Sequence, residues 1–261
     1  MDLDRAVARD SPIHRADPRL KLIATIATIL AITLVPIGGF LALAIAWAAL
    51  TIASVVARLG PIRLSRGAFI ALPFLLAAVP LIFVRTGNPL GSIGPLTISG
   101  EGLVMFATIA LKSWLSVQAA LLLTFTTPFH DLVDAMRDLR IPRILVAIVS
   151  FMYRYLAVIG DEATRMLRAR SARSATALAG SSGGSIGWRA RVTGQMVGSL
   201  FLRSYERSER IYAAMQARGF EGTFRHLGSR PVEPGAWAAF ALLMGALVGF
   251  EIAAHLVLPH A

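Results

Sequence analysis

The stretch LIATIATILAITLVPIGGFLALAIAWAALTIASVVA, residues 22–57, contains no charged side chain, and this run decides the fold. As one continuous helix it would be about 54 Å long, whereas the hydrocarbon core of a bilayer is about 30 Å thick. The chain must therefore turn back within the run, and Pro36-Ile37-Gly38-Gly39 is the only strong helix breaker there. We predict two membrane spans, at 20–36 and 40–57.

Three further apolar runs follow, at residues 67–84, 103–125 and 236–258. Pro73 and Pro80 should kink the first of these runs, Lys112 is the only charge in the second, and Glu251 and His255 lie near the end of the third. A helix satisfies all its backbone polar groups internally, which the bilayer core requires. We therefore predict an all-α, polytopic membrane protein with about five transmembrane helices and two long cytoplasmic helices.

We divide the chain into a membrane body (1–126), a cytoplasmic region with the two long helices (127–235) and a fifth transmembrane helix (236–261). Acids and arginines are mixed in the first nineteen residues, so we expect an uncleaved first helix rather than a signal peptide. Composition agrees with a membrane protein: 56% of residues are hydrophobic and 16% are charged, against about 25% charged in ordinary soluble domains. The absence of cysteine excludes a disulfide framework, a zinc–thiolate site and a thiol nucleophile.

The basic residues predict the orientation. Of the 26 Lys and Arg residues, twenty-four lie before residue 22, in 58–66 or in 127–235. Because Lys and Arg accumulate on the cytoplasmic side, we predict a cytoplasmic N-terminus and an outer C-terminus, in a bacterial inner membrane. This asymmetry accounts for the net charge of +11 without nucleic acid, and no aromatic residues are interleaved as a stacking platform would require. The partner that we expect is the lipid bilayer, not nucleic acid.

The region 127–235 contains two predicted long helices. An amphipathic segment at 128–136 precedes the first helix, and charged residues at helical spacing extend that helix through 161–171. A glycine- and serine-rich break at 180–187 separates it from a second helix at 188–217. Apolar residues of the first helix recur every three or four positions, as on one helix face: Ile144, Leu145, Ile148, Val149, Met152, Leu156 and Ile159.

Both long helices are predicted to end in an arginine between two small residues. The two endings are Ala169-Arg170-Ser171 and Ala217-Arg218-Gly219. A guanidinium presents a rigid fork to a carboxylate, and small neighbours let a partner protein approach the helix closely. An arginine near a helix C-terminus also complements the helix dipole. From the residues alone, both a docking site and an ordinary helix end remain open.

The chain resembles the transmembrane T component of energy-coupling factor (ECF) transporters of the cobalt/nickel type, the CbiQ/EcfT family. The resemblance rests on DSPIHRADPRLKL at 10–22, on Ile141-Pro142 and on the paired Ala-Arg-small endings. The first ending has Ser171 where glycine is common in the family. Because Ala172-Arg173-Ser174 repeats the pattern, Arg173 is the alternative to Arg170.

The resemblance implies a non-catalytic coupling subunit of an ATP-driven importer. Its two cytoplasmic helices would dock on two P-loop ATPase subunits through the residues Ala169, Arg170, Ser171, Ala217, Arg218 and Gly219. Its membrane body would hold a membrane-embedded substrate-binding subunit. Closure of the ATPases would move the helix ends and, through them, that subunit. The implied cargo is cobalt or nickel, although T components for vitamins look alike.

No catalytic, cofactor or metal site is predicted in this chain. The histidines show no pair at ligand spacing, and no Gly-x4-Gly-Lys-Ser/Thr phosphate loop occurs. Two alternatives stay open: an intramembrane lipid or isoprenoid enzyme, which would need Asp-rich magnesium clusters that are missing, and a conventional ABC permease. Lys112, Gln118 and Glu251 are polar groups in or near the spans and are candidate sites. For Lys112 we favour snorkelling over binding of a partner subunit.

The arginine asymmetry predicts sidedness that thiol labelling can test. In this cysteine-free chain, Ser182→Cys should be cytoplasmic and Ser92→Cys should face outward. An impermeant maleimide added to intact cells should therefore label the second variant and not the first. Labelling of both from outside would contradict the predicted topology.

Overall fold

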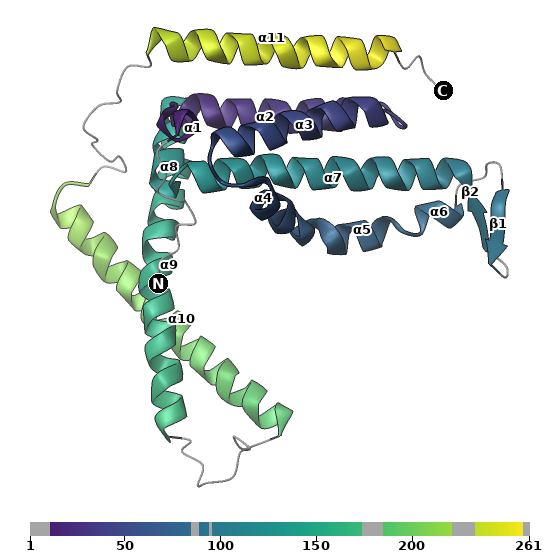
Figure 1. Cartoon of the computed structure of the whole chain (residues 1–261). Helices are drawn as coiled ribbons and strands as arrows, with labels where there is room; N and C mark the ends of the chain where they lie inside the picture. The colour runs from purple at the N-terminus through teal and green to yellow at the C-terminus, as the bar shows by residue number, and fades with distance from the viewer. Residues whose placement is uncertain (1–10, 85–88, 94–95, 174–184, 221–232, 258–261) are drawn as a thin grey trace. The chain divides into compact units, whose positions relative to one another are not determined.

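The computed structural model describes residues 11–84, 89–93, 96–173, 185–220 and 233–257. The chain forms two compact units, which we treat separately (Figure 1). Of the described residues, those in 11–139 and 233–257 form the bundle unit, and those in 140–173 and 185–220 form the two-helix unit. Most described residues are helical, and several helices are long and apolar enough to cross a membrane. The predicted all-α polytopic fold is therefore confirmed.

The bundle unit contains α1 (Pro12–Arg15), α2 (Pro18–Leu34), α3 (Phe40–Val56), α4 (Pro61–Gly67), the 3-10 helix η1 (Ala68–Ala71), α5 (Leu72–Ala78), α6 (Leu81–Val84), α7 (Gly100–Thr126), α8 (Phe129–Asp138) and α11 (Pro234–Val257). The first two predicted spans are α2 and α3. They are separated at the predicted breaker, where Gly38 adopts a φ of 84° that favours glycine. The side chain of Asp17 caps α2 by accepting a hydrogen bond from the Arg19 amide at 2.9 Å.

The third apolar run is broken into short pieces. α4, η1 and α5 follow one another from residue 61, six residues before the predicted start of the span. Pro73 lies in the first turn of α5, where its missing N–H costs nothing. The chain breaks again at Val79 and Pro80 before α6 begins. The two prolines thus interrupt the run where kinks were predicted.

A short antiparallel hairpin precedes the longest bundle helix, and the sequence analysis did not predict it. Strands β1 (Pro89–Ile93) and β2 (Leu96–Ser99) pair with each other. The side chain of Ser99 then caps α7 by accepting a hydrogen bond from the Gly102 amide at 3.0 Å.

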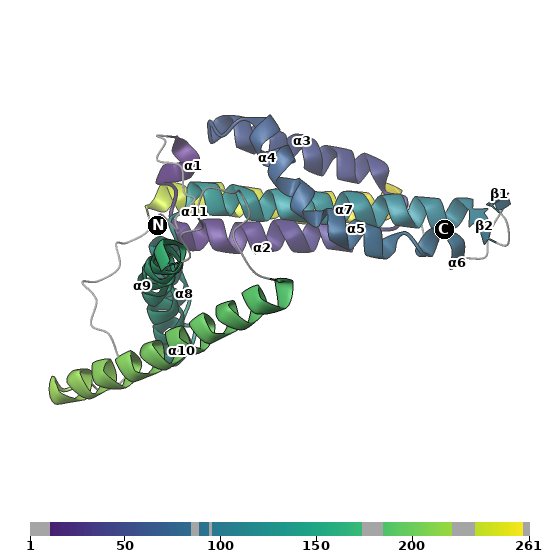
Figure 2. The ribbon, with the colours of Figure 1, turned by 90° about the horizontal axis from the view of Figure 1, so that it is seen from below.

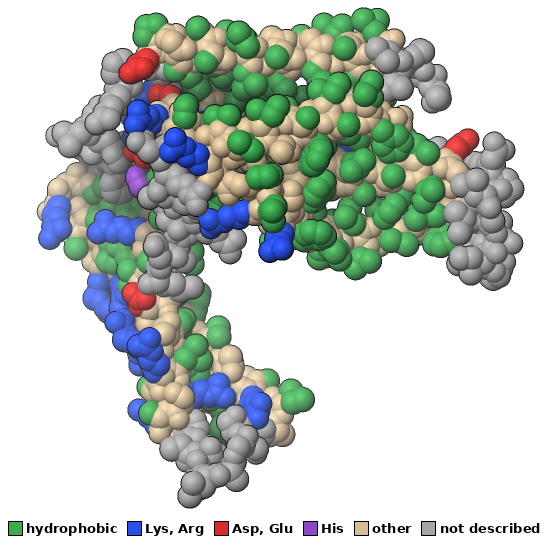
Figure 3. All heavy atoms as spheres, in the orientation of Figure 1, with side chains coloured by type: hydrophobic (Ala, Val, Ile, Leu, Met, Phe, Trp, Pro, Cys, Tyr) green, Lys and Arg blue, Asp and Glu red, His purple; other side chains and the backbone are tan. Residues whose placement is uncertain are grey.

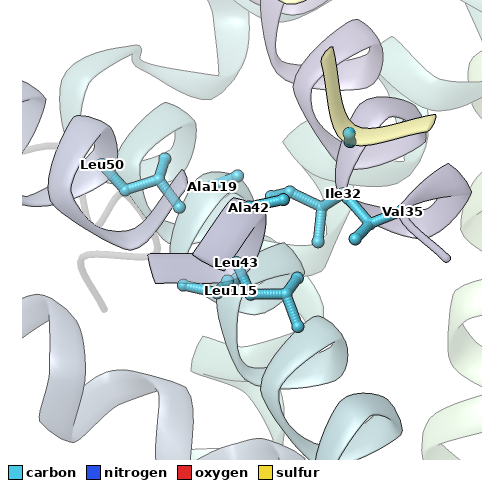
Figure 4. Close-up of a cluster of buried hydrophobic side chains, with 8 residues drawn as sticks. Ile32, Val35, Ala42, Leu43, Leu50, Leu115 and Ala119 are labelled. Carbon is cyan, nitrogen blue, oxygen red and sulfur yellow. The ribbon is translucent and has the colours of Figure 1, made fainter. Parts of the chain in front are cut away.

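The core of the bundle lies where α2, α3 and α7 meet, and the two views show these helices running along one another (Figures 1 and 2). Leu43 of α3 and Leu115 of α7 are 2% and 1% exposed (Figure 4). α11 packs on α2 and contributes only Ala254 to the buried cluster. The remaining members of the cluster are Ile32, Val35, Ala42, Leu50 and Ala119.

The outer surface of the bundle is apolar. Leu41, Phe74 and Leu242 are 68%, 77% and 76% exposed, and Figure 3 shows hydrophobic side chains over much of the visible face. So much exposed apolar surface is typical of a lipid-facing protein. By length and composition, four helical segments of the described chain could cross a membrane: 61–78, α7, α9 (Arg143–Arg173) and α11. α3 is equally apolar but has 17 residues.

The two lysines of the chain have the same role in the bundle. Lys21 Nζ donates hydrogen bonds to the carbonyl oxygens of His14, at 3.0 Å, and of Thr126, at 3.3 Å. Lys112 Nζ donates to the carbonyl oxygens of Thr33 and Val35. Thr126 ends α7, and Thr33 and Val35 lie at the end of α2, so each ammonium binds carbonyls at a neighbouring helix C-terminus. Lys112 therefore has a structural partner, and the snorkelling that we favoured is not what the structure shows.

Gly102 provides a stability test of the contact between α6 and α7. A Cβ at this position would lie 2.8 and 2.9 Å from the carbonyl oxygens of Leu81 and Ile82, so Gly102→Ala must displace α6. We expect a loss of about 1–3 kcal/mol, the usual cost of overpacking, measured as a lower Tm of the detergent-purified chain. Gly194→Ala is the control, because Gly194 has nothing within 4 Å of an added Cβ. It should raise stability slightly, and an equal loss in both variants would contradict the close approach.

Candidate functional site

The two-helix unit contains α9 and α10 (Ile186–Ala217), which cross one another (Figure 1). α9 extends over the predicted first helix, and α10 begins two residues before the predicted second helix and ends with it. α8 is the predicted amphipathic segment, and it packs on α2 in the bundle unit. Ala169-Arg170-Ser171 lies in the last described turn of α9, and Ala217-Arg218-Gly219 lies at the end of α10.

The first arginine ending lies against α10. Arg170 is half-buried, its Nη1 donates a 3.4 Å hydrogen bond to the Thr193 hydroxyl, and its Cζ lies 6.0 Å from the centre of the Trp188 ring. Such a distance permits a cation–π interaction. Its neighbours Ala169 and Ser171 are exposed. Arg170 is thus held between the two helices rather than presented on a free helix end.

The second arginine ending closes α10. Gly219 has a φ of 77°, the Phe220 amide donates to the Met215 carbonyl at 3.0 Å, and the Gly219 amide donates to the Gln216 carbonyl at 2.9 Å. This pair of hydrogen bonds is the Schellman motif, which needs glycine at the left-handed position. Gly219 therefore has a local structural role. Ala217 and Arg218 are exposed, and no ion pair of Arg218 occurs within the described residues.

A positively charged groove of about 570 Å³ lies between α9 and α10. Its charged residues are Arg165, Arg170, Arg173, Arg203 and Glu162, and its apolar residues include Met166, Trp188, Val192 and Met196. Four guanidinium groups and one carboxylate suit an acidic partner group. Both candidates for the first motif, Arg170 and the alternative Arg173, line this groove, while Arg218 lies at the far end of α10.

Glu162 connects the two helices. Its carboxylate accepts a 2.8 Å hydrogen bond from Arg165 on its own helix and a 3.1 Å hydrogen bond from Arg203 on α10. The hydrogen bond from Arg165, aided by Arg203, holds the pKa of Glu162 below its usual range. Glu162 is therefore ionised at neutral pH. The sequence indicated the pair of Glu162 with Arg165 through its helical spacing, but nothing in the sequence pointed to Arg203, Thr193 or Trp188.

The other described candidate residues belong to the bundle unit. No group of three or more His, Asp or Glu residues that could bind a metal occurs among the described residues. Of the five histidines, His14, His130 and His255 are described, whereas His226 and His260 lie outside the described residues. Glu251 lies 3.7 Å from His255, one turn along α11. Gln118 is buried in α7.

The sequence of the chain is similar to those of known transport proteins. The family model described as cobalt transport protein (CbiQ) matches residues 9–229. A Bifidobacterium longum protein named as an ABC transporter ATP-binding protein is 30% identical over 95% of this chain and 32% of its own length. The cobalt transport protein CbiQ of Rhodobacter capsulatus is 29% identical over 68% of this chain and 69% of its own.

A third relative is the energy-coupling factor transporter transmembrane protein EcfT of Ruminiclostridium cellulolyticum, 28% identical over 83% of this chain and 82% of its own length. The chain thus matches about a third of the Bifidobacterium longum protein but most of the EcfT protein.

The pairing of α9 with α10 through Glu162 can be tested by distance measurement. Nitroxide labels on Arg168→Cys and Ala190→Cys, the only cysteines in the chain, report the distance between the two helices. Glu162→Gln removes the charge that Arg165 and Arg203 share, so we expect a clearly broader distance distribution. Glu206→Gln is the control, because Glu206 pairs only with Arg210 within α10. Equal distributions in both variants would show that Glu162 does not hold the helices together.

Proposed function

Because the chain belongs to the CbiQ family of cobalt transport proteins, we propose that it is the coupling subunit of an ECF importer that carries cobalt. The family match over residues 9–229 is the observation that supports this most directly. It makes the chain a membrane component of a transporter. Coupling to ATPases, the partner subunits and the cargo are our proposals.

We propose that the two-helix unit is cytoplasmic, although α9 is apolar enough to cross a membrane. Sixteen arginines fall in 127–235, and Arg154 lies in the middle of the most apolar part of α9 with its side chain exposed. A guanidinium at the centre of a span costs about 2.5–3.5 kcal/mol on insertion scales. α9 also shares Glu162 with α10, whose many arginines make it unsuited to hydrocarbon. Both helices are therefore better placed outside the bilayer.

Outside the bilayer, the apolar stripe of α9 would be exposed to water unless a partner protein covers it. Ile144, Ile148 and Met152 are 69%, 56% and 59% exposed in the isolated chain. Exposed apolar stripes of this size mark interaction surfaces. We assign this stripe to the membrane-embedded substrate-binding subunit, which the bundle would also contact through its apolar outer face.

We propose that the two arginine endings dock on two P-loop ATPase subunits. The Bifidobacterium longum relative supports an ATPase partner: it is about three times as long as the matched region and is named as an ATP-binding protein. Arg218 is exposed on a rigid helix end and is ready to enter an acidic groove. Arg170 must exchange its contacts with Thr193 and Trp188 for those of the partner.

In this proposal the transport cycle is mechanical. ATP-driven closure of the two ATPases would move the helix ends that they hold, and the chain would pass the movement to the substrate-binding subunit. The ATPases must contact the two helices differently in their open and closed states, because only differential contacts shift an equilibrium. The name of the family and of the Rhodobacter capsulatus relative favour cobalt as the cargo. The cargo would be bound by another subunit.

The docking proposal predicts graded losses on substitution. Leaving a desolvated carboxylate of the partner unpaired costs about 2 kcal/mol or more, which weakens docking about thirtyfold. Arg218→Ala and Arg170→Ala should each lower Co²⁺ uptake sharply, and Arg218→Lys should restore it only in part, since lysine lacks the planar fork. The double alanine variant should lose the ATPase on co-purification while remaining in the membrane.

Arg191→Ala is the matched control, because Arg191 is an exposed arginine of the same unit outside both endings. It should transport normally. If the double variant still co-purifies with an ATPase at normal stoichiometry, the two arginines are ordinary helix ends and the docking assignment is wrong.

A further inference from the structure

The charged residues that precede and begin α2 bind three other elements of the bundle. Asp17 caps α2, and Arg19 Nη2 lies 2.6 Å from Asp138 Oδ2, at the end of α8. Lys21 Nζ binds the carbonyl oxygens of His14 in α1 and Thr126 in α7. The side chains of Arg19 and Asp138 are 23% and 18% exposed, so water screens this pair only partly. The start of α2 is thus tied to α1, α7 and α8.

Arg19 and Asp138 both lie at the wrong helix ends for their charges. Arg19 is in the first turn of α2, where the positive end of the helix dipole disfavours a cation. Asp138 is the last residue of α8, where the negative end disfavours an acid. Interaction with the helix dipoles therefore does not explain why a cation lies at position 19 and an acid at position 138. Their mutual pairing does, together with a longer contact of 3.9 Å between Arg19 and Asp17.

Asp138 occupies the last turn of the bundle before the chain enters the two-helix unit. The first segment of the bundle unit ends at Leu139, Arg140 has a φ of 61°, and α9 begins at Arg143. A positive φ at a residue other than glycine or asparagine is uncommon and marks a sharply defined turn. α8 itself packs on α2. Residues 139–142 are thus the short covalent connection between α8 and α9.

We propose that the Arg19–Asp138 pair is the connection that transmits movement of the coupling helices to the membrane helices. This inference rests on the proposed coupling function. With the pair intact, α8 and α2 move as one body, so a pull on α9 reaches the helix that packs on α7 and α11. Without the pair, α8 can shift along the bundle surface while α2 stays in place. Arg19 and Asp138 are positioning residues, since neither would touch ATP or cargo.

The unfavourable helix ends provide a specific test, because exchanging the two charges keeps the pair and improves both dipole interactions. The variants are Arg19→Asp, Asp138→Arg and the double exchange. Arg137→Ala is the matched control, because it removes an ion pair with Asp134 that lies within α8. The first measurement is hydrogen exchange of the α8 amides in the full chain in nanodiscs. The second is uptake of radioactive Co²⁺ per ATP hydrolysed by the complex with its co-purifying subunits.

We expect each single change to speed exchange of the α8 amides about fivefold, the factor produced by about 1 kcal/mol. Uptake per ATP should fall by a similar factor while ATPase co-purification persists, and the double exchange should restore both. Unchanged α8 exchange in the single variants would overturn the connection. Faster exchange with normal uptake per ATP would overturn its role in coupling.

The two measurements also separate this inference from the proposed function. If the unchanged chain brings no ATPase with it, the proposed function fails and the coupling role fails with it, while α8 exchange still decides whether the pair fixes α8 to α2. If the ATPase is present and Arg137→Ala behaves like the single exchanges, general loss of charge is the cause and the inference is wrong.

Discussion

Cations and the hydrocarbon core of the bilayer exclude one another, and the bundle depends on this constraint. Twenty-four of the 26 basic residues lie outside the apolar runs and on one predicted side. On the face that Figure 3 shows, Lys and Arg side chains of the bundle gather near α1, α4 and α8. The exceptional Lys112 is satisfied by the carbonyl oxygens at the end of α2. An ammonium placed at a helix C-terminus gains from the dipole and satisfies carbonyls that have no intrahelical partner.

The two-helix unit is held together by polar contacts rather than by buried apolar side chains. Among its described residues only Val146 is buried in α9, and α10 has no buried residue. Its helices are held by polar contacts of Glu162 and Arg170, which are individually weak at an exposed site. In the proposed assembly, a unit with so little apolar burial would gain stability by binding its partners. This agrees with a role as a coupling element and not as a separately folded domain.

Much of the fold could be predicted from the sequence because its signals are local. The uncharged runs, the break at Gly38 and the kinks at Pro73 and Pro80 each follow from residue type and spacing. The hairpin before α7 was not predicted, because its two strands carry opposite signals: Thr97 and Ile98 of β2 favour a strand, whereas Pro89 and Gly91 of β1 disfavour one. In the candidate site, the position of Gly219 past the helix end was predictable. The hydrogen bond of Arg170 with Thr193 of α10 joins residues 23 apart and depends on how two helices cross, which no short-range pattern encodes.

α10 is a rigid helix that contacts α9 along one part of its length and ends in the Schellman motif at Gly219. It can therefore rotate as one body about its contact with α9. The contacts with α9 extend from Trp188 to Arg203, and the remaining 14 residues to Ala217 project about 21 Å further. A partner that displaces the Arg218 end by about 4 Å turns the helix about 10° around the Glu162 contact. Thr193 and Trp188 lie on the other side of the Glu162 contact, so they then move relative to Arg170. In the proposed function, a partner bound at Arg218 would thus alter the surroundings of Arg170, because one rigid helix carries the contacts of both.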